Sequence, residues 1–107
     1  MIVTTTNGIE GRRVTDYLGV VHGTAVMGSN LFRDFFAGIR DVVGGRVGSY
    51  ETVLSDAKEA ALADLQSRAE ALRADAIIGV SIDHDSIGGD SKTILMVSAT
   101  GTAVRLS

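Results

Sequence analysis

The sequence has 107 residues, no cysteine, no proline and a formal net charge of -3 at pH 7. This length predicts one domain, residues 1–107, and the small negative charge predicts no nucleic-acid partner. The lack of cysteine excludes disulfides, thiolate metal sites and a cysteine nucleophile, and it fits a reducing compartment. The first residues lack a signal-peptide pattern, and no apolar run approaches the roughly 20 residues of a membrane span. We therefore expect a cytoplasmic protein without a membrane partner.

Two strands are expected in the first 27 residues. Ile2 to Thr6 is rich in β-branched residues, and Val14 to Met27 is a longer strand in which glycines predict bulges or close backbone approach. Simple alternation gives the longer strand two apolar faces, one with Leu18, Val20 and Val26 and one with Tyr17, Val21, Ala25 and Met27. One long helix can cover only one of these faces, so the other is expected at a subunit interface.

Residues Leu31 to Val43, preceded by Asn30 as a cap, predict a short helix. Its apolar residues occupy more than half of its circumference and include all three phenylalanines of the chain. Such a helix has to be buried on more than one side. We therefore expect oligomerisation to be obligatory and to run through this helix.

The stretch from Ser49 to Asp75 predicts one long helix. Its apolar residues recur at helical spacing and form a single stripe that needs a sheet or other helices to cover it. The stripe consists of Tyr50, Val53, Leu54, Ala57, Ala61, Leu65, Ala69 and Leu72.

Two further strands are expected after the long helix. Ala76 to Ser86 alternates, which places Ile78, Val80, Ile82 and His84 on one face and Gly79, Ser81, Asp83 and Asp85 on the other. Gly88, Gly89 and Asp90 indicate a hairpin loop, and Thr93 to Leu106 forms the last strand. The predicted order is strand, strand, short helix, long helix, strand, strand.

The stretch YLGVVHGTAVMGSNLFRDFFAGIRDVVGGRVGSY, from Tyr17 to Tyr50, resembles the YbjQ-like family. So do the opening IVTTTNGIEG, the ADAIIGV from Ala74 to Val80 and the MVSATGTAV from Met96 to Val104. The family is largely uncharacterised and is often labelled heavy-metal-binding. The resemblance implies a two-layer α/β (α+β) subunit similar to dodecin, in which one long and one short helix pack on a small, largely antiparallel sheet. It also implies a homopentameric ring that acts as a multivalent ligand scaffold, and it supplies no catalytic residues.

A metal site would have to use His22, Asp83, His84 and Asp85. The two histidines lie on different strands, and strand alternation points His84 away from its two aspartate neighbours. Soft heavy metals favour thiolate ligands, and the chain has none. A structural role for these residues is therefore favoured, and no cofactor is evident.

The GGRVGS run from Gly44 to Ser49 precedes the long helix and is a candidate anion cradle, with Gly44, Gly45 and Arg46. The lysine of a phosphate-binding loop is missing, so a plain helix-to-helix connection is favoured. Arg33 and Arg40 lie seven residues apart and could bind a ligand as a charged ring in an oligomer, although ion pairing with Asp34 and Asp41 is the favoured role.

No nucleophile, phosphate-binding or paired-carboxylate motif is visible, so we expect a protein that is not an enzyme. The favoured function is a cytoplasmic homo-oligomer that holds an unidentified small ligand. A metal-binding protein is the alternative, and an enzyme with its site at the Gly44 to Ser49 loop is the least favoured.

Overall fold

A computed structural model describes residues 1–27, 47–88 and 93–107. These residues form β1 (Ile2–Val3), β2 (Val14–Met27), α2 (Val47–Ala71), β3 (Ala76–Gly88) and β4 (Thr93–Leu106). The bounds predicted for β2 and β4 are confirmed, whereas the long helix begins two residues before Ser49 and ends before Asp75. The short helix predicted for residues 31–43 and most of the predicted hairpin loop lie outside the described residues.

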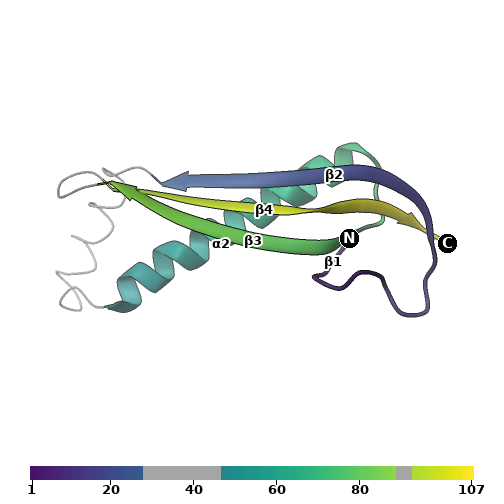
Figure 1. The fold of residues 1–107 in the computed structure, drawn as a ribbon, viewed down its shortest axis with the longest axis horizontal. Helices are drawn as coiled ribbons and strands as arrows, with labels where there is room; N and C mark the ends of the chain where they lie inside the picture. The colour runs from purple at the N-terminus through teal and green to yellow at the C-terminus, as the bar shows by residue number, and fades with distance from the viewer. Residues whose placement is uncertain (28–46, 89–92) are drawn as a thin grey trace.

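The four strands form one mixed sheet in the order β1-β3-β4-β2, with α2 crossing one of its faces obliquely (Figure 1). Only β1 pairs in parallel, with β3, while β4 pairs antiparallel with both of its neighbours. A solved structure described below has the same fold. The predicted α+β class and largely antiparallel sheet are thus confirmed.

The apolar stripe of α2 is buried against the sheet. Val53, Ala57, Ala61, Leu65 and Ala69 are each at most 2% exposed, and the helix packs chiefly on β2 and β4. Leu72, which was predicted to extend the stripe, is 42% exposed because the helix ends one residue before it. The stripe consists largely of small residues, so the helix axis can lie close to the strands.

Gly23 of β2 is the position of closest approach between helix and sheet. A methyl group built there would overlap the Ala61 carbonyl oxygen and the Leu65 amide nitrogen, and it would lie 2.9 Å from the Leu65 Cα. All three are backbone atoms of α2. The missing side chain at Gly23 is therefore what lets the helix lie directly on the strand.

The C-terminus of α2 closes with a Schellman motif built on an arginine. The Ala74 amide donates to the Ala69 carbonyl at 3.1 Å, and the Arg73 amide donates to the Glu70 carbonyl at 2.9 Å. Arg73 has a φ of 62°, and the residue with this left-handed conformation at the end of a helix is usually glycine. Its carbonyl accepts a hydrogen bond from Nε of Arg105 at 3.3 Å, which ties the end of the helix to β4.

Bulges in β2 and β3 change two of the predicted faces. In β2, Tyr17 pairs with Val104 and Gly19 with Ala103, so Leu18 is the extra residue. Leu18 consequently packs toward the helix-side core. Its predicted sharing of a face with Val20 is wrong, because a bulge reverses the alternation.

The same effect operates in β3. Ile78 pairs with Thr102 and Ser81 pairs with Thr100, which leaves Gly79, at a φ of 61°, and Val80 opposite Gly101. Val80 joins the helix-side core, whereas Ile78 is buried on the other face of the sheet. The predicted shared face of Ile78 and Val80 is therefore also wrong.

A small second core lies on the sheet face opposite α2. Ala76, Ile78 and Val104 are buried there beneath Ile9, Val14 and Leu106. The segment between β1 and β2 thus covers one end of this face. Nothing in the described residues covers the rest of the sheet face opposite α2.

Candidate functional site

The sheet surface opposite α2, beyond the second core, is a candidate interaction surface, because it carries exposed large apolar side chains. We call it the open face. The cross-strand pairs on it combine β3, β4 and β2 in successive rows. It comprises Tyr17, Val20, His22, Thr24 and Val26 of β2, Ser81, Asp83 and Asp85 of β3, and Ile94, Met96, Ser98, Thr100 and Thr102 of β4.

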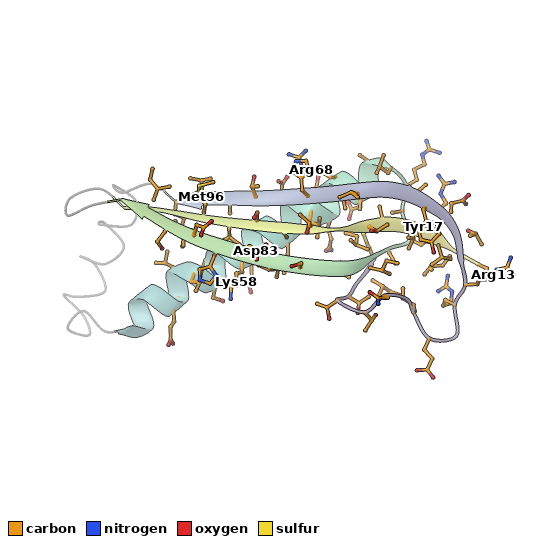
Figure 2. All side chains as sticks on the ribbon, viewed as in Figure 1. Arg13, Tyr17, Lys58, Arg68, Asp83 and Met96 are labelled. Carbon is orange, nitrogen blue, oxygen red and sulfur yellow. The ribbon has the colours of Figure 1, made fainter. Side chains whose placement is uncertain are left out.

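Apolar side chains lie at both ends of the open face. Tyr17 is 74% exposed and Val20 is 78% exposed near the second core. Val26 is 59% exposed and Met96 42% exposed toward the other end, where Ile94 is also exposed. Figure 2 labels Tyr17 and Met96, which lie far apart along the sheet. Exposed valines and a tyrosine on a flat strand surface are typical of an interface that is buried in an assembly.

Between these apolar ends runs a polar band two rows wide. One row is Ser81, Thr100 and His22, and the next is Asp83, Ser98 and Thr24. Most of these side chains are exposed. The serine and threonine side chains are short, so they project less from the sheet than the apolar side chains at the two ends. The band offers hydroxyl, carboxylate and imidazole groups to a small polar ligand.

The structure does not bring the four candidate metal ligands together. His22 lies on β2 and Asp83 lies on β3 in the next row, with β4 between them, so their backbones are more than two strand spacings, or about 9.5 Å, apart. His84 pairs with Val97, a core residue under the helix, and therefore faces away from Asp83 and Asp85 as predicted. Across residues 1–27, 47–88 and 93–107 no three His, Cys, Asp or Glu side chains form a metal-binding group.

A different acidic residue, Asp64 of α2, contacts β2 at Thr24, two residues from His22. Its Oδ2 accepts a hydrogen bond from the Thr24 amide at 3.1 Å and lies 3.5 Å from Nε of Arg68. The Thr24 hydrogen bond is the largest cause that lowers the pKa of the Asp64 carboxyl. Asp64 could not be predicted as part of the site, since only its i,i+4 spacing to Arg68 is visible in the sequence.

The predicted anion and ligand residues Arg33, Arg40, Gly44, Gly45 and Arg46 lie outside the described residues. Among described arginines, Arg12 donates from Nε to the Ser107 carbonyl at 2.8 Å. This contact ties the turn before β2 to the residue that follows β4.

Neither the described residues nor the comparisons point to catalysis. Within the described residues, no helix combines the length and apolar character needed to cross a membrane.

A family model described as "Putative heavy-metal-binding" matches residues 1–107. A crystal structure of a protein of unknown function from the DUF74 family of Pediococcus pentosaceus is similar to this chain at 22% identity, with a TM-score of 0.59. The alignment covers 100% of this chain and 98% of that one. The chain therefore belongs to the YbjQ-like family, and the solved structure shows its fold.

Proposed function

We propose that this member of the YbjQ-like family is a homo-oligomer that buries the apolar parts of its open face between subunits and holds a small ligand there. The observation that carries the proposal is the exposure of Val20, at 78%, and of Tyr17, at 74%, on the face opposite the helix. Fully burying one valine stabilises an assembly by roughly 1.5–2 kcal/mol. A symmetric ring repeats that gain at every interface.

The pentameric state that the resemblance implies is part of this proposal. Cyclic symmetry would bring one copy of the polar band from each subunit into an equivalent position. A ligand bound between subunits would then meet repeated hydroxyl groups together with His22 and Asp83. This arrangement suits a small polar molecule, and a cytoplasmic location remains our expectation.

The proposal is tested with Val20→Lys and with Ala63→Lys as the matched control. Val20 is on the open face, whereas Ala63 is exposed on α2. We expect native mass spectrometry and sedimentation velocity to show an oligomer for wild type and Ala63→Lys and a smaller species for Val20→Lys. A monomeric wild type, or a Val20→Lys variant with the wild-type mass and melting temperature, would refute the proposal.

Ligand binding needs a separate measurement. Native mass spectra of protein purified without harsh washing should contain a retained small molecule, and His22→Ala should reduce its occupancy. Equal occupancy in the two proteins would place the ligand outside the polar band.

Metal binding is the second candidate, favoured by the family description and by the contact of Asp64 with Thr24, two residues from His22. A zinc site needs three or four ligands. The Asp64 carboxylate is also already engaged by Arg68 and the Thr24 amide. A third ligand would have to come from another subunit, so we rank this function below the first.

A further inference from the structure

Among the described strands β2 lies at an edge of the sheet, because it pairs with β4 alone. The Thr24 amide points away from β4, since its partner is the side chain of Asp64. Because backbone N–H groups alternate in direction along a strand, the N–H of His22 points away from β4 as that of Thr24 does. An unpaired strand edge of this length is a template on which the strand of another molecule can add.

Asp64 contacts this edge at Thr24, three residues before the last residue of β2. Its carboxylate takes the Thr24 N–H at 3.1 Å, although the two residues lie 40 positions apart in the sequence. Among the described residues, no hydrogen-bond partner is recorded for the outward N–H of His22. The contact at Thr24 is therefore specific to one position of the edge.

Two features fix the carboxylate at that position. The absence of a side chain at Gly23 seats the backbone of Ala61 and Leu65 directly against β2, and Asp64 belongs to the same turn of α2. Nε of Arg68, one turn further on, lies 3.5 Å from Oδ2 of Asp64, the same oxygen that accepts from Thr24, and forms an exposed ion pair with it. The pKa of Asp64 is lowered, so the group is ionised at neutral pH.

We propose that Asp64 blocks the addition of a strand from a second copy of this chain to the β2 edge. An incoming strand needs the Thr24 N–H as a donor, and it would have to displace a carboxylate that is already hydrogen-bonded. It would also place its own backbone carbonyls next to a negative charge. Copies of the chain are thereby prevented from extending the sheet edge to edge, whether or not they assemble through the open face.

The first test is amide hydrogen exchange of the wild-type protein, followed by NMR at residues of β2. We expect the Thr24 amide to exchange roughly tenfold more slowly than the His22 amide, since only Thr24 has a charged acceptor. Equal and strong protection of both amides would mean that a strand occupies the edge, and equal fast exchange would mean that the carboxylate does not hold Thr24. Either result overturns the proposal.

The second test compares Asp64→Ala, which removes the acceptor, with Asp64→Asn, which keeps an acceptor oxygen. Asp56→Ala, an exposed acidic position on the same helix, is the matched control. We expect Asp64→Ala alone to form larger species in sedimentation velocity and to raise thioflavin T fluorescence over time.

A folded Asp64→Ala protein with the wild-type mass distribution and flat fluorescence would overturn the proposal. Growth of the Asp56→Ala control to the same extent would do so as well, because loss of any acidic residue would then suffice. If Asp64→Ala does not fold, the exchange measurement on the wild type decides.

Discussion

Replacing Gly23 by alanine tests the close seating of α2 on β2. The new carbon would lie 2.9 Å from the Leu65 Cα, whereas ordinary contacts begin at 3.4 Å, and it would overlap two other backbone atoms of the helix. These atoms cannot rotate away as the end of a side chain can. The helix would have to retreat from the strand by roughly 1 Å to restore normal contact distances.

The loss of stability comes from weaker packing between the helix and the sheet. Val53, Ala57, Ala61, Leu65 and Ala69 lose packing along the stripe, all of them at most 2% exposed at present. Overpacking of a core costs typically about 1–3 kcal/mol. We expect the upper end of that range because the obstacle is backbone, and a domain of this size loses about 4 °C in melting temperature per kcal/mol. The expected loss is therefore roughly 12 °C.

Thermal unfolding followed by circular dichroism measures this change, at one protein concentration for every variant. Gly8→Ala is the control, because a side chain at Gly8 meets nothing within 4 Å and its φ is not positive. We expect the control to melt with the wild type. A Gly23→Ala protein that melts within about 2 °C of the wild type, the range of a neutral surface change, would refute the close contact.

Three further predictions follow from the cap, the Asp64 contact and the histidines. Arg73→Gly should raise the melting temperature by roughly 2–4 °C in calorimetry, since glycine adopts the positive φ without strain. A variant that melts below the wild type would contradict the cap assignment. Because its pKa is lowered from 3.8, Asp64 should stabilise the fold at neutral pH and lose this effect as the pH falls through its folded-state pKa. The difference in urea unfolding free energy between wild type and Asp64→Asn should therefore be constant at neutral pH and shrink in acid, and a difference that grows in acid would contradict the assignment. Titration calorimetry with zinc, copper or nickel should show no stoichiometric sub-micromolar site. A site of that affinity that is abolished by His22→Ala or His84→Ala would disprove the prediction that the histidines form no tight metal site.

Much of the fold was predictable because periodicity is strong in three segments. The bounds of β2 and β4 and the apolar stripe of α2 follow directly from alternation and helical spacing. The faces of Leu18 and Ile78 were not predictable, since each depends on a bulge that shifts the pairing by one residue. Glycines in both strands signalled bends, but a glycine does not reveal whether it marks a bulge or a close approach.

The candidate site was less predictable than the fold. Simple alternation correctly separates His84 from its aspartate neighbours, because the bulge in β3, between Ile78 and Ser81, lies before that part of the strand. It does not reveal that Asp64 contacts β2 at Thr24, two residues from His22, because that contact depends on how α2 crosses the sheet. Contacts between residues 40 positions apart require the tertiary arrangement, and no local pattern encodes it.

The central place of β4 in the sheet also has a consequence for how the chain folds. Of the four described strands, β4 alone pairs with β2, and Val14 is matched to Leu106 near the other end of the sequence. During synthesis β2 therefore emerges long before its partner β4, whereas β3 and β4 are neighbours in sequence and pair antiparallel. Such non-local pairing slows folding and prolongs the exposure of unpaired strands. The helix is made before β4, so α2 is available to cover β2 during the interval in which that strand is most prone to misassembly.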